Sequence, residues 1–181
     1  MIRVATSRDL PGIVRIYNQA IRRYSERGEM PVTAFVEPLT VKERRSWFEQ
    51  HGAETYPIWV FDRPRKAVDE ARAVAGWCSL SPYRSGRAAL RHGTEVSYYV
   101  AEEHQRQGIG SALLSHAVEA APELGFHAVI AVLLGINDAS IALLEAHEFE
   151  QWGRLPEIAR FDDKRYDHLI YGRTVEACAP E

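Results

Sequence analysis

A segment in the middle of the chain restricts the possible folds more than any other feature of the sequence. Residues 95–100 read EVSYYV, and β-branched and aromatic residues at this density predict a strand. The loop AEEH follows, and then the run QRQGIG at 105–110. From 108 to 124 the apolar residues recur at helical spacing. The glycine-rich run therefore joins a strand to an amphipathic helix.

This glycine-rich loop has the chemistry of an anion site. Gly108 and Gly110 have no Cβ, so the backbone at these positions can approach a ligand closely. The helix behind them presents unpaired N–H groups and the positive end of its dipole, which suit a phosphate. Three interpretations fit the pattern: a turn that only connects strand and helix, a dinucleotide site, and a site for the pyrophosphate of coenzyme A.

The dinucleotide interpretation lacks two of the residues that it requires. Leu113 stands where the third glycine belongs, and no acidic residue ends the apolar run at 127–135 to bind a ribose. A P-loop is excluded, because no Gly-Lys-Ser/Thr follows the glycines. The spacing alone leaves the connecting turn and the coenzyme A site open.

The rest of the chain predicts one α+β domain over 1–181, with a frayed tail from about 174. T-x-x-D at 6–9 and T-x-x-E at 40–43 are capping signals that begin two helices, and a short helix is predicted over 138–147. The run 127–134 is apolar enough for a strand buried on both faces. The predicted strands are 2–5, 58–61, 73–80, 95–100, 127–134, 149–153 and 166–172, with loops at 63–72 and 81–93.

Composition and charge exclude several classes of function. The 181 residues include 22 Lys and Arg against 25 Asp and Glu, a net charge of −3, so no basic field suits nucleic acid. No apolar stretch approaches the roughly 20 residues of a membrane span, and the N-terminus has no signal-peptide pattern. The histidines are scattered and Cys78 is far from Cys178, so neither a metal site nor a disulfide is expected. These features predict a cytoplasmic protein.

The glycine-rich loop is one of several motifs that point to a known family. Gln105-x-x-Gly108-x-Gly110 between a strand and an amphipathic helix resembles the acyl-CoA loop of the GCN5-related N-acetyltransferases (GNAT). Over nearly its whole length the chain is similar to the phosphinothricin and methionine sulfoximine N-acetyltransferases of that superfamily. The segments that match in order and spacing are 16–18, 35–38, 45–48, 76–77, 94–95, 104–110 and 137–143.

The resemblance implies a fold and a cofactor site. The fold is a mixed central sheet splayed around acetyl-CoA, with helices on both faces, and the assembly is a homodimer. The backbone at 98–100 would pair with the pantetheine arm, the loop at 105–111 would bind the pyrophosphate, and the helix start at 137 would bond the lower part of the cofactor arm. The cofactor-binding residues implied are Tyr98, Tyr99, Val100, Gln105, Arg106, Gln107, Gly108, Ile109, Gly110, Ser111, Asn137 and Ser140.

The resemblance also assigns catalytic roles to two residues. Glu95 matches the acidic residue that serves as general base, and an amine must lose its proton before it attacks a thioester. The backbone N–H of Val100 would donate to the developing oxyanion. On spacing alone, Glu95 is better interpreted as a solvated strand residue, because glutamate is mostly exposed.

The loop before Glu95 is a candidate acceptor site. Tyr83, Arg84 and Arg87 lie in it, and arginine pairs well with a substrate carboxylate. A solvated loop explains these residues equally well, because surface arginine is common. The expected acceptor is the primary amine of a small amino-acid-like molecule, and a protein N-terminus stays possible.

Four positions depart from the subfamily pattern. Leu90 replaces a tyrosine near the substrate, and Leu144 stands where a histidine or tyrosine lies near the leaving thiolate. Glu148 fills a left-handed cap position that is usually glycine, and the segment 159–166 differs from the usual substrate segment. We therefore expect an altered substrate, and we keep a second hypothesis, a non-catalytic acyl-CoA-binding module.

Overall fold

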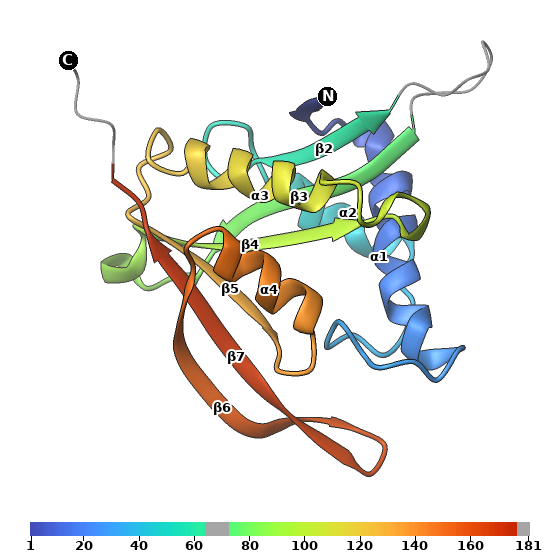
Figure 1. Ribbon diagram of the computed structural model, residues 1–181. Helices are drawn as coiled ribbons and strands as arrows, with labels where there is room; N and C mark the ends of the chain where they lie inside the picture. Colours follow the sequence, from blue (N-terminus) through green and yellow to red (C-terminus); the bar gives the residue numbers. More distant parts are fainter. Residues whose placement is uncertain (64–72, 177–181) are drawn as a thin grey trace.

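The computed structural model describes residues 1–63 and 73–176 (Figure 1). Within them, seven strands form one sheet in the order β1-β2-β3-β4-β5-β7-β6. Neighbouring strands are antiparallel except β4 and β5, which makes the sheet mixed, as expected. The strands are β1 (Ile2–Val4), β2 (Ile58–Arg63), β3 (Ala73–Pro82), β4 (Gly93–Val100), β5 (Ala128–Leu134), β6 (Glu150–Phe161) and β7 (Lys164–Thr174).

Helices cover both faces of this sheet (Figure 1). Trp77 packs on one face with residues of α1 (Leu10–Ser25) and α2 (Val41–Glu49). Cys78, its neighbour on β3, points to the opposite face and joins the larger core beneath α3 (Ile109–Ala120) and α4 (Asp138–Ala146). The alternation of side chains along a strand explains why adjacent residues belong to different cores.

The sheet opens between its two parallel strands. β4 pairs with β5 only where Gly93–Glu95 faces Ala128–Ile130. Beyond this point the two strands diverge, as Figure 1 shows, while β4 stays paired with β3 and β5 stays paired with β7. The opening is the splay that the resemblance implies, and it leaves one edge of β4 without a neighbouring strand.

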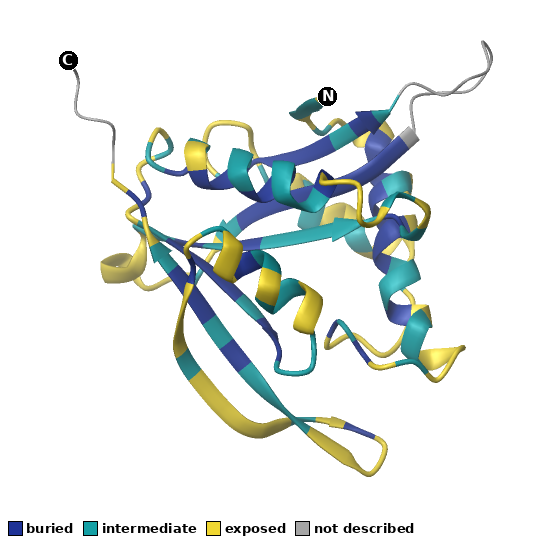
Figure 2. Ribbon diagram, viewed as in Figure 1, coloured by how far each residue is buried: buried dark blue, intermediate teal, exposed yellow. Residues whose placement is uncertain are grey.

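The structure corrects several predicted boundaries. β3 continues through Pro82, so residues 81 and 82 belong to a strand and not to a loop, and α3 ends at Ala120 rather than 124. β6 runs to Phe161, beyond the predicted end at 153. Most of this strand is exposed, as Figure 2 shows, and its sequence therefore lacks the alternation of apolar and polar residues from which a strand is predicted. In the described part of the predicted tail, Val175 is buried and its N–H donates to the His127 carbonyl at 2.8 Å.

The expectations about the loop before β3, the C-terminal tail, metal binding and membrane helices are limited to the residues that the structure describes. Of the loop predicted at 63–72, Arg63 belongs to β2 and residues 64–72 lie outside the described residues, as do Cys178 and the rest of the tail at 177–181. Among the residues that are described, no group of three or more His, Cys, Asp and Glu could hold a metal ion. No helix in that part of the chain is long and apolar enough to cross a membrane.

Candidate active site

The opening between β4 and β5 is a cleft of about 500 Å³ that passes from one side of the sheet toward the other. Its walls come from 96–100 of β4, 131–133 of β5, the start of α3 and part of α4. Gln19, Ala20 and Arg23 of α1 also line it, and Gln19 Oε1 accepts from the Glu102 N–H at 3.3 Å. The cleft therefore has contact with the helices of both faces, and a ligand in it can meet groups from either side.

The backbone of β4 offers hydrogen-bonding groups to this cleft at alternate residues. Ala101 N–H donates to the Ala75 carbonyl of β3. In an antiparallel pair the direction of these groups alternates, so Tyr99 pairs with β3 whereas Tyr98 and Val100 direct their N–H and C=O toward the missing strand. Of the three residues expected to bind the pantetheine arm, Tyr98 and Val100 are thus placed to do so, and the backbone of Tyr99 is not.

The glycine-rich loop turns into α3 at the mouth of the cleft. Gly108 is the N-cap of the helix with φ of 76°, a left-handed conformation in which a side chain is strained. Arg106 has a positive φ of 57° and therefore shares this conformation. The turn directs the first N–H groups of α3 outward, where an anion can reach them. Among the described residues of the loop, Gln105, Arg106, Gly108, Ile109, Gly110 and Ser111 line the cleft.

Three of the expected loop ligands have their side chains engaged with protein groups, and the first of them, Gln105, donates its amide to the Val100 carbonyl at 3.3 Å. The amide of Gln107 donates to the Glu103 carbonyl at 3.2 Å, and Gln107 is not part of the cleft wall. Ser111 Oγ lies 2.8 Å from His147 Nε2, at the end of α4. The structure therefore brings Ser111 to the site with its hydroxyl already hydrogen-bonded and leaves Gln107 outside it.

Asn137 and Ser140 form the start of α4. Asn137 Oδ1 accepts from the Ser140 N–H at 3.2 Å and its Nδ2 donates to the Val32 carbonyl at 3.4 Å. Asn137 lines the cleft, and Ser140 is not among the lining residues. Asn137 thus caps the helix and fastens the segment between α1 and α2 across the opening.

Glu95 lies on the opposite face of the sheet from α3, directly across from Ser81 on β3. Its carboxyl is largely buried, and burial raises its pKa above the ordinary value, while the positive charge of Arg84 acts in the opposite direction. Glu95 itself is not a lining residue of the cleft, whereas Val96 and Ser97 are. A carboxylate with a raised pKa near the cleft can accept a proton through an intervening water molecule.

A histidine that the sequence did not single out is linked to the strand position opposite Glu95. His51 Nδ1 lies 2.7 Å from the Trp47 carbonyl, which can only accept, so this nitrogen carries the proton. His51 Nε2 then accepts from the Ser81 hydroxyl at 3.2 Å. Burial lowers the pKa of His51, which favours this neutral form. Ser81 is consequently held in one orientation beside Glu95.

Tyr83, Arg84 and Arg87 gather around a separate hollow of about 300 Å³ at the other end of β4. The Arg84 guanidinium lies 5.2 Å from the centre of the Tyr83 ring. Leu90, which is 42% exposed, lines the same hollow. The structure therefore places the three candidate acceptor-binding residues together, and Arg84 alone among them acts on the pKa of Glu95.

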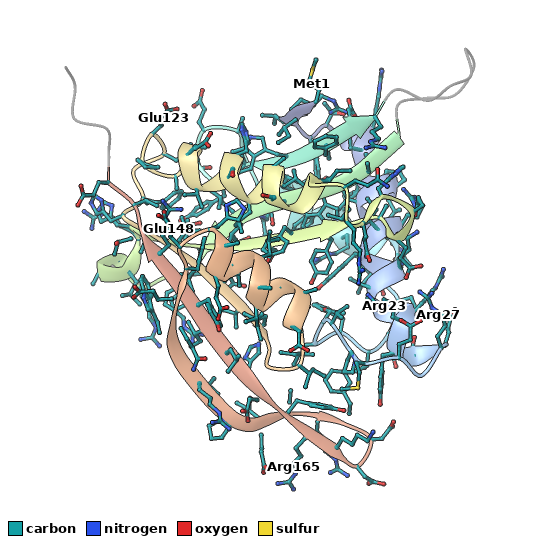
Figure 3. The ribbon with its side chains drawn as sticks, viewed as in Figure 1. Met1, Arg23, Arg27, Glu123, Glu148 and Arg165 are labelled. Carbon is teal, nitrogen blue, oxygen red and sulfur yellow. The ribbon has the colours of Figure 1, made fainter. Side chains whose placement is uncertain are left out.

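The positions that depart from the subfamily pattern have clear structural places. Leu144 is fully buried in the wall of the cleft, so it supplies an apolar surface there. Glu148 has a φ of 62°, which confirms that a glutamate occupies a left-handed position, and its carboxylate forms a 2.7 Å ion pair with Arg173. The segment 159–166 contains the end of β6, the turn at 162–163 and the start of β7, where Figure 3 labels Arg165.

Several cleft residues had no signal in the sequence. Gln19, Ala20 and Arg23 belong to a helix whose apolar side faces the sheet, and Val32 lies in an irregular segment. Figure 3 shows Arg23 near the end of α1, where it forms an ion pair with Glu29 at 2.8 Å. These residues reach the site only through the packing of α1 against the sheet.

Comparison with known proteins gives one consistent result. Residues 18–149 match the model of the Acetyltransferase (GNAT) family. The Bacillus subtilis protein YwnH, provisionally named a phosphinothricin acetyltransferase, is 40% identical over 95% of this chain and 97% of its own length. The L-methionine sulfoximine/L-methionine sulfone acetyltransferase of Pseudomonas paraeruginosa is 32% identical, over 88% of this chain and 85% of its own.

The fold also resembles that of a solved structure. The phosphinothricin acetyltransferase of Sinorhizobium meliloti, determined in complex with acetyl-CoA, superposes with a TM-score of 0.82 at 31% identity. The match covers 97% of this chain and 88% of that protein. The similarity thus extends through the sheet, the cleft and the helices on both of its faces.

Proposed function

Because the chain belongs to the acetyltransferase (GNAT) family and is an acetyl-CoA-dependent N-acetyltransferase, we propose that it acetylates the primary amine of a small amino-acid-like molecule, of the phosphinothricin or methionine sulfoximine type or a close relative. The observation that carries this proposal is the cleft between β4 and β5, with a helix N-terminus at its mouth and Glu95 behind it.

The residues of the cleft fit coenzyme A. The free edge of β4 at Tyr98 and Val100 can pair with the amides of an extended arm, as an added strand would. The N-terminus of α3 and the glycine-rich loop suit the pyrophosphate, and Asn137 stands on the opposite wall. When bound, acetyl-CoA supplies an acetyl group activated as a thioester.

Glu95 and Val100 are the residues to which we assign the chemistry. Glu95, with its raised pKa, accepts a proton from the acceptor amine through water and so leaves a nucleophilic nitrogen. The Val100 N–H, directed into the cleft, donates to the carbonyl oxygen as negative charge develops on it. Attack is direct, in a ternary complex, because none of the described residues that line the cleft is a cysteine.

The leaving thiolate needs a different proton donor from the one usual in the subfamily. Leu144 cannot donate a proton. Burial raises the pKa of Tyr98 to about 12, so its hydroxyl keeps its proton at neutral pH. We assign the protonation to the Tyr98 hydroxyl or to water, and we assign the acceptor end of the site to Tyr83, Arg84 and Arg87.

Free thiol release from acetyl-CoA tests this proposal. The amine panel contains the amino acids, methionine sulfone, methionine sulfoximine, phosphinothricin, polyamines and short peptides. We expect turnover with amino-acid-like amines and none with polyamines. If no amine of the panel causes thiol release while acetyl-CoA still raises the melting temperature of the protein, the non-catalytic acyl-CoA-binding module is supported instead.

We also propose that the protein works as a cytoplasmic homodimer. The free thiol of Cys78, in the described part of the chain, is typical of a reducing compartment and supports this location. The exposed apolar side chains Trp152, Leu155 and Ile158 on β6 support self-association. Sedimentation of the purified protein at micromolar concentration measures the oligomeric state directly.

A further inference from the structure

Arg44, on α2, is a half-buried arginine without a carboxylate partner among the residues that the structure describes. Its guanidinium lies 4.4 Å from the ring centre of Trp47, 5.0 Å from that of Tyr17 and 5.7 Å from that of Phe35. We call these three residues the aromatic enclosure. Within the described part of the chain, the Arg44 side chain has no hydrogen bond to another residue.

A second arginine of this chain shows how a partly buried guanidinium is usually accommodated. Arg3 lies between Asp9 and Asp62 and forms ion pairs of 2.8 and 2.6 Å with them. Arg44 instead has aromatic rings as neighbours, and burial lowers its pKa. The fold therefore places this cation where it loses part of its hydration, and the described residues supply no anion to replace the lost water.

The geometry of the guanidinium indicates what the missing partner is. Its five N–H donors lie in one plane and point outward from the edge, and aromatic rings stabilise the cation without accepting those bonds strongly. Two parallel N–H groups match the oxygens of a carboxylate or phosphinate. An edge left free by the aromatic enclosure is thus a receptor for an oxyanion.

Arg44 stands on the same face of the sheet as Glu95. Tyr99 and Glu95 are four residues apart on β4, so both point toward α1 and α2, about 13 Å from each other along the strand. The Tyr17 ring lies 4.6 Å from that of Tyr99, which places the enclosure next to this end of β4. Trp47, through His51, connects the enclosure to Ser81 opposite Glu95.

These positions define where an acceptor lies. If Glu95 takes the proton and Val100 N–H faces the acetyl group, the amine is held between them, close to Tyr99. We propose that Arg44 binds an oxyanion of the acceptor, either its α-carboxylate or an oxyanion of its side chain, and so restricts the enzyme to amines that carry a negative charge. This inference rests on the proposed function and adds the residue that selects the substrate class.

Arg84, which we assigned with Tyr83 and Arg87 to the acceptor end of the site, is the competing candidate for binding the oxyanion. Arg84 lies in an exposed loop, where an ion pair is screened by water and contributes little. Arg44 is half-buried and ordered by three rings, so its pair with an oxyanion is stronger. Arg84→Met is therefore the informative comparison for Arg44→Met.

The experiment compares matched amines. Methionine sulfone is paired with 3-(methylsulfonyl)propylamine, which lacks only the α-carboxylate. Phosphinothricin is paired with methionine sulfone, whose side chain lacks the oxyanion. In Arg44→Met we expect kcat/KM to fall about 10- to 100-fold for the amine that carries the bound oxyanion, the range for loss of a hydrogen bond to a charged group. The matched amine without it should change less than about twofold, because its contacts persist.

Two further variants separate recognition from folding. Arg44→Lys keeps the charge but not the two-pronged geometry, so we expect an intermediate loss. Arg45→Met, at the exposed neighbouring position of α2, should leave both members of each pair unchanged. Melting temperatures of all variants identify any that fail to fold, and the KM for acetyl-CoA should be constant across the series.

The outcomes are distinct for the two proposals. Equal losses for both members of a pair, or loss of selectivity in Arg84→Met and not in Arg44→Met, would overturn the inference. If the wild type acetylates none of the amines, the proposed function fails, and calorimetric binding of methionine sulfone then decides the role of Arg44. Binding that Arg44→Met abolishes supports it, and binding that is unchanged or absent in the wild type contradicts it.

Discussion

Tyr98, Tyr99 and Val100 are consecutive residues with different environments. Tyr98 and Val100 direct backbone groups into the cleft, while Tyr99 pairs with β3 and its ring packs 5.0 Å from that of Trp77. A strand predicted from the sequence implies that backbone groups alternate in direction, but it does not tell whether the odd- or the even-numbered residues face the opening. At this scale the sequence names three candidate residues together, and the register of β3 against β4 separates them.

Glu95→Gln tests the general base. Glutamine keeps the size of the side chain and cannot accept the proton, so kcat should fall about 10²- to 10⁴-fold. The KM for acetyl-CoA should stay within about twofold, because Glu95 does not line the cleft. Because burial raises the pKa of Glu95, the acidic limb of the wild-type rate profile should lie above the ordinary carboxyl value and vanish in the variant. Parallel losses of both parameters would contradict this role.

Among the helices, α3 depends on lying very close to the sheet at Gly76. An added Cβ at Gly76 of β3 would lie 3.0 Å from Ile109 Cγ2, 3.1 Å from Leu113 Cδ1 and 3.1 Å from the Tyr99 carbonyl. Gly76 therefore allows the first turns of α3 to lie directly on the sheet. The helix N-terminus that faces the cleft owes its position to this contact.

Gly76→Ala tests the seating of α3. The overpacked methyl group should lower the free energy of unfolding by about 1–3 kcal/mol and raise the KM for acetyl-CoA, because the helix N-terminus moves. Gly52→Ala, where the nearest atom is 3.4 Å away, is the matched control and should have little effect. Urea denaturation and thiol-release kinetics measure the two quantities. A Gly76→Ala protein with wild-type values would show that α3 is not held by this contact.

At the scale of the whole molecule, Arg3 connects the edge of the sheet to the first helix. Its guanidinium joins Asp9, just before α1, to Asp62 of β2, and both carboxylate side chains are under 9% exposed. Burial raises the pKa of Asp9, but hydrogen bonds from Arg3 and Thr6 outweigh it and leave this pKa below its ordinary value. The stability from Asp9 is therefore present above the unfolded pKa and is lost as pH falls through the folded one.

Arg3→Met should destabilise the fold by about 3–5 kcal/mol at pH 7, since it removes the cation from buried carboxylates. The difference from the wild type should shrink below about pH 5, because Asp9 then keeps only the Thr6 hydrogen bonds against the effect of burial and becomes protonated more easily. Arg22→Met, which breaks an exposed pair with Glu26, should cost under about 1 kcal/mol. Urea denaturation as a function of pH measures all three proteins. A difference that is constant with pH would contradict this account.

The sequence by itself determined what depends on neighbouring residues. The capping box at Thr40, the glycine at the start of α3 and the buried run of β5 follow from local spacing, and the order of the motifs identified the family. These features are set within a turn or a strand, because caps, φ values and side-chain periodicity involve residues close in the chain.

Only the tertiary structure decided what depends on packing between distant segments. The divergence of β4 from β5, the enclosure of Arg44 by rings from α1, α2 and the segment between them, and the pairing of the polar residues of β6 have no local pattern. Burial raises the pKa of Glu95 and lowers that of Arg44, and burial is a property of the assembled fold. The family was therefore readable from the sequence, whereas the residue proposed to select the acceptor was not.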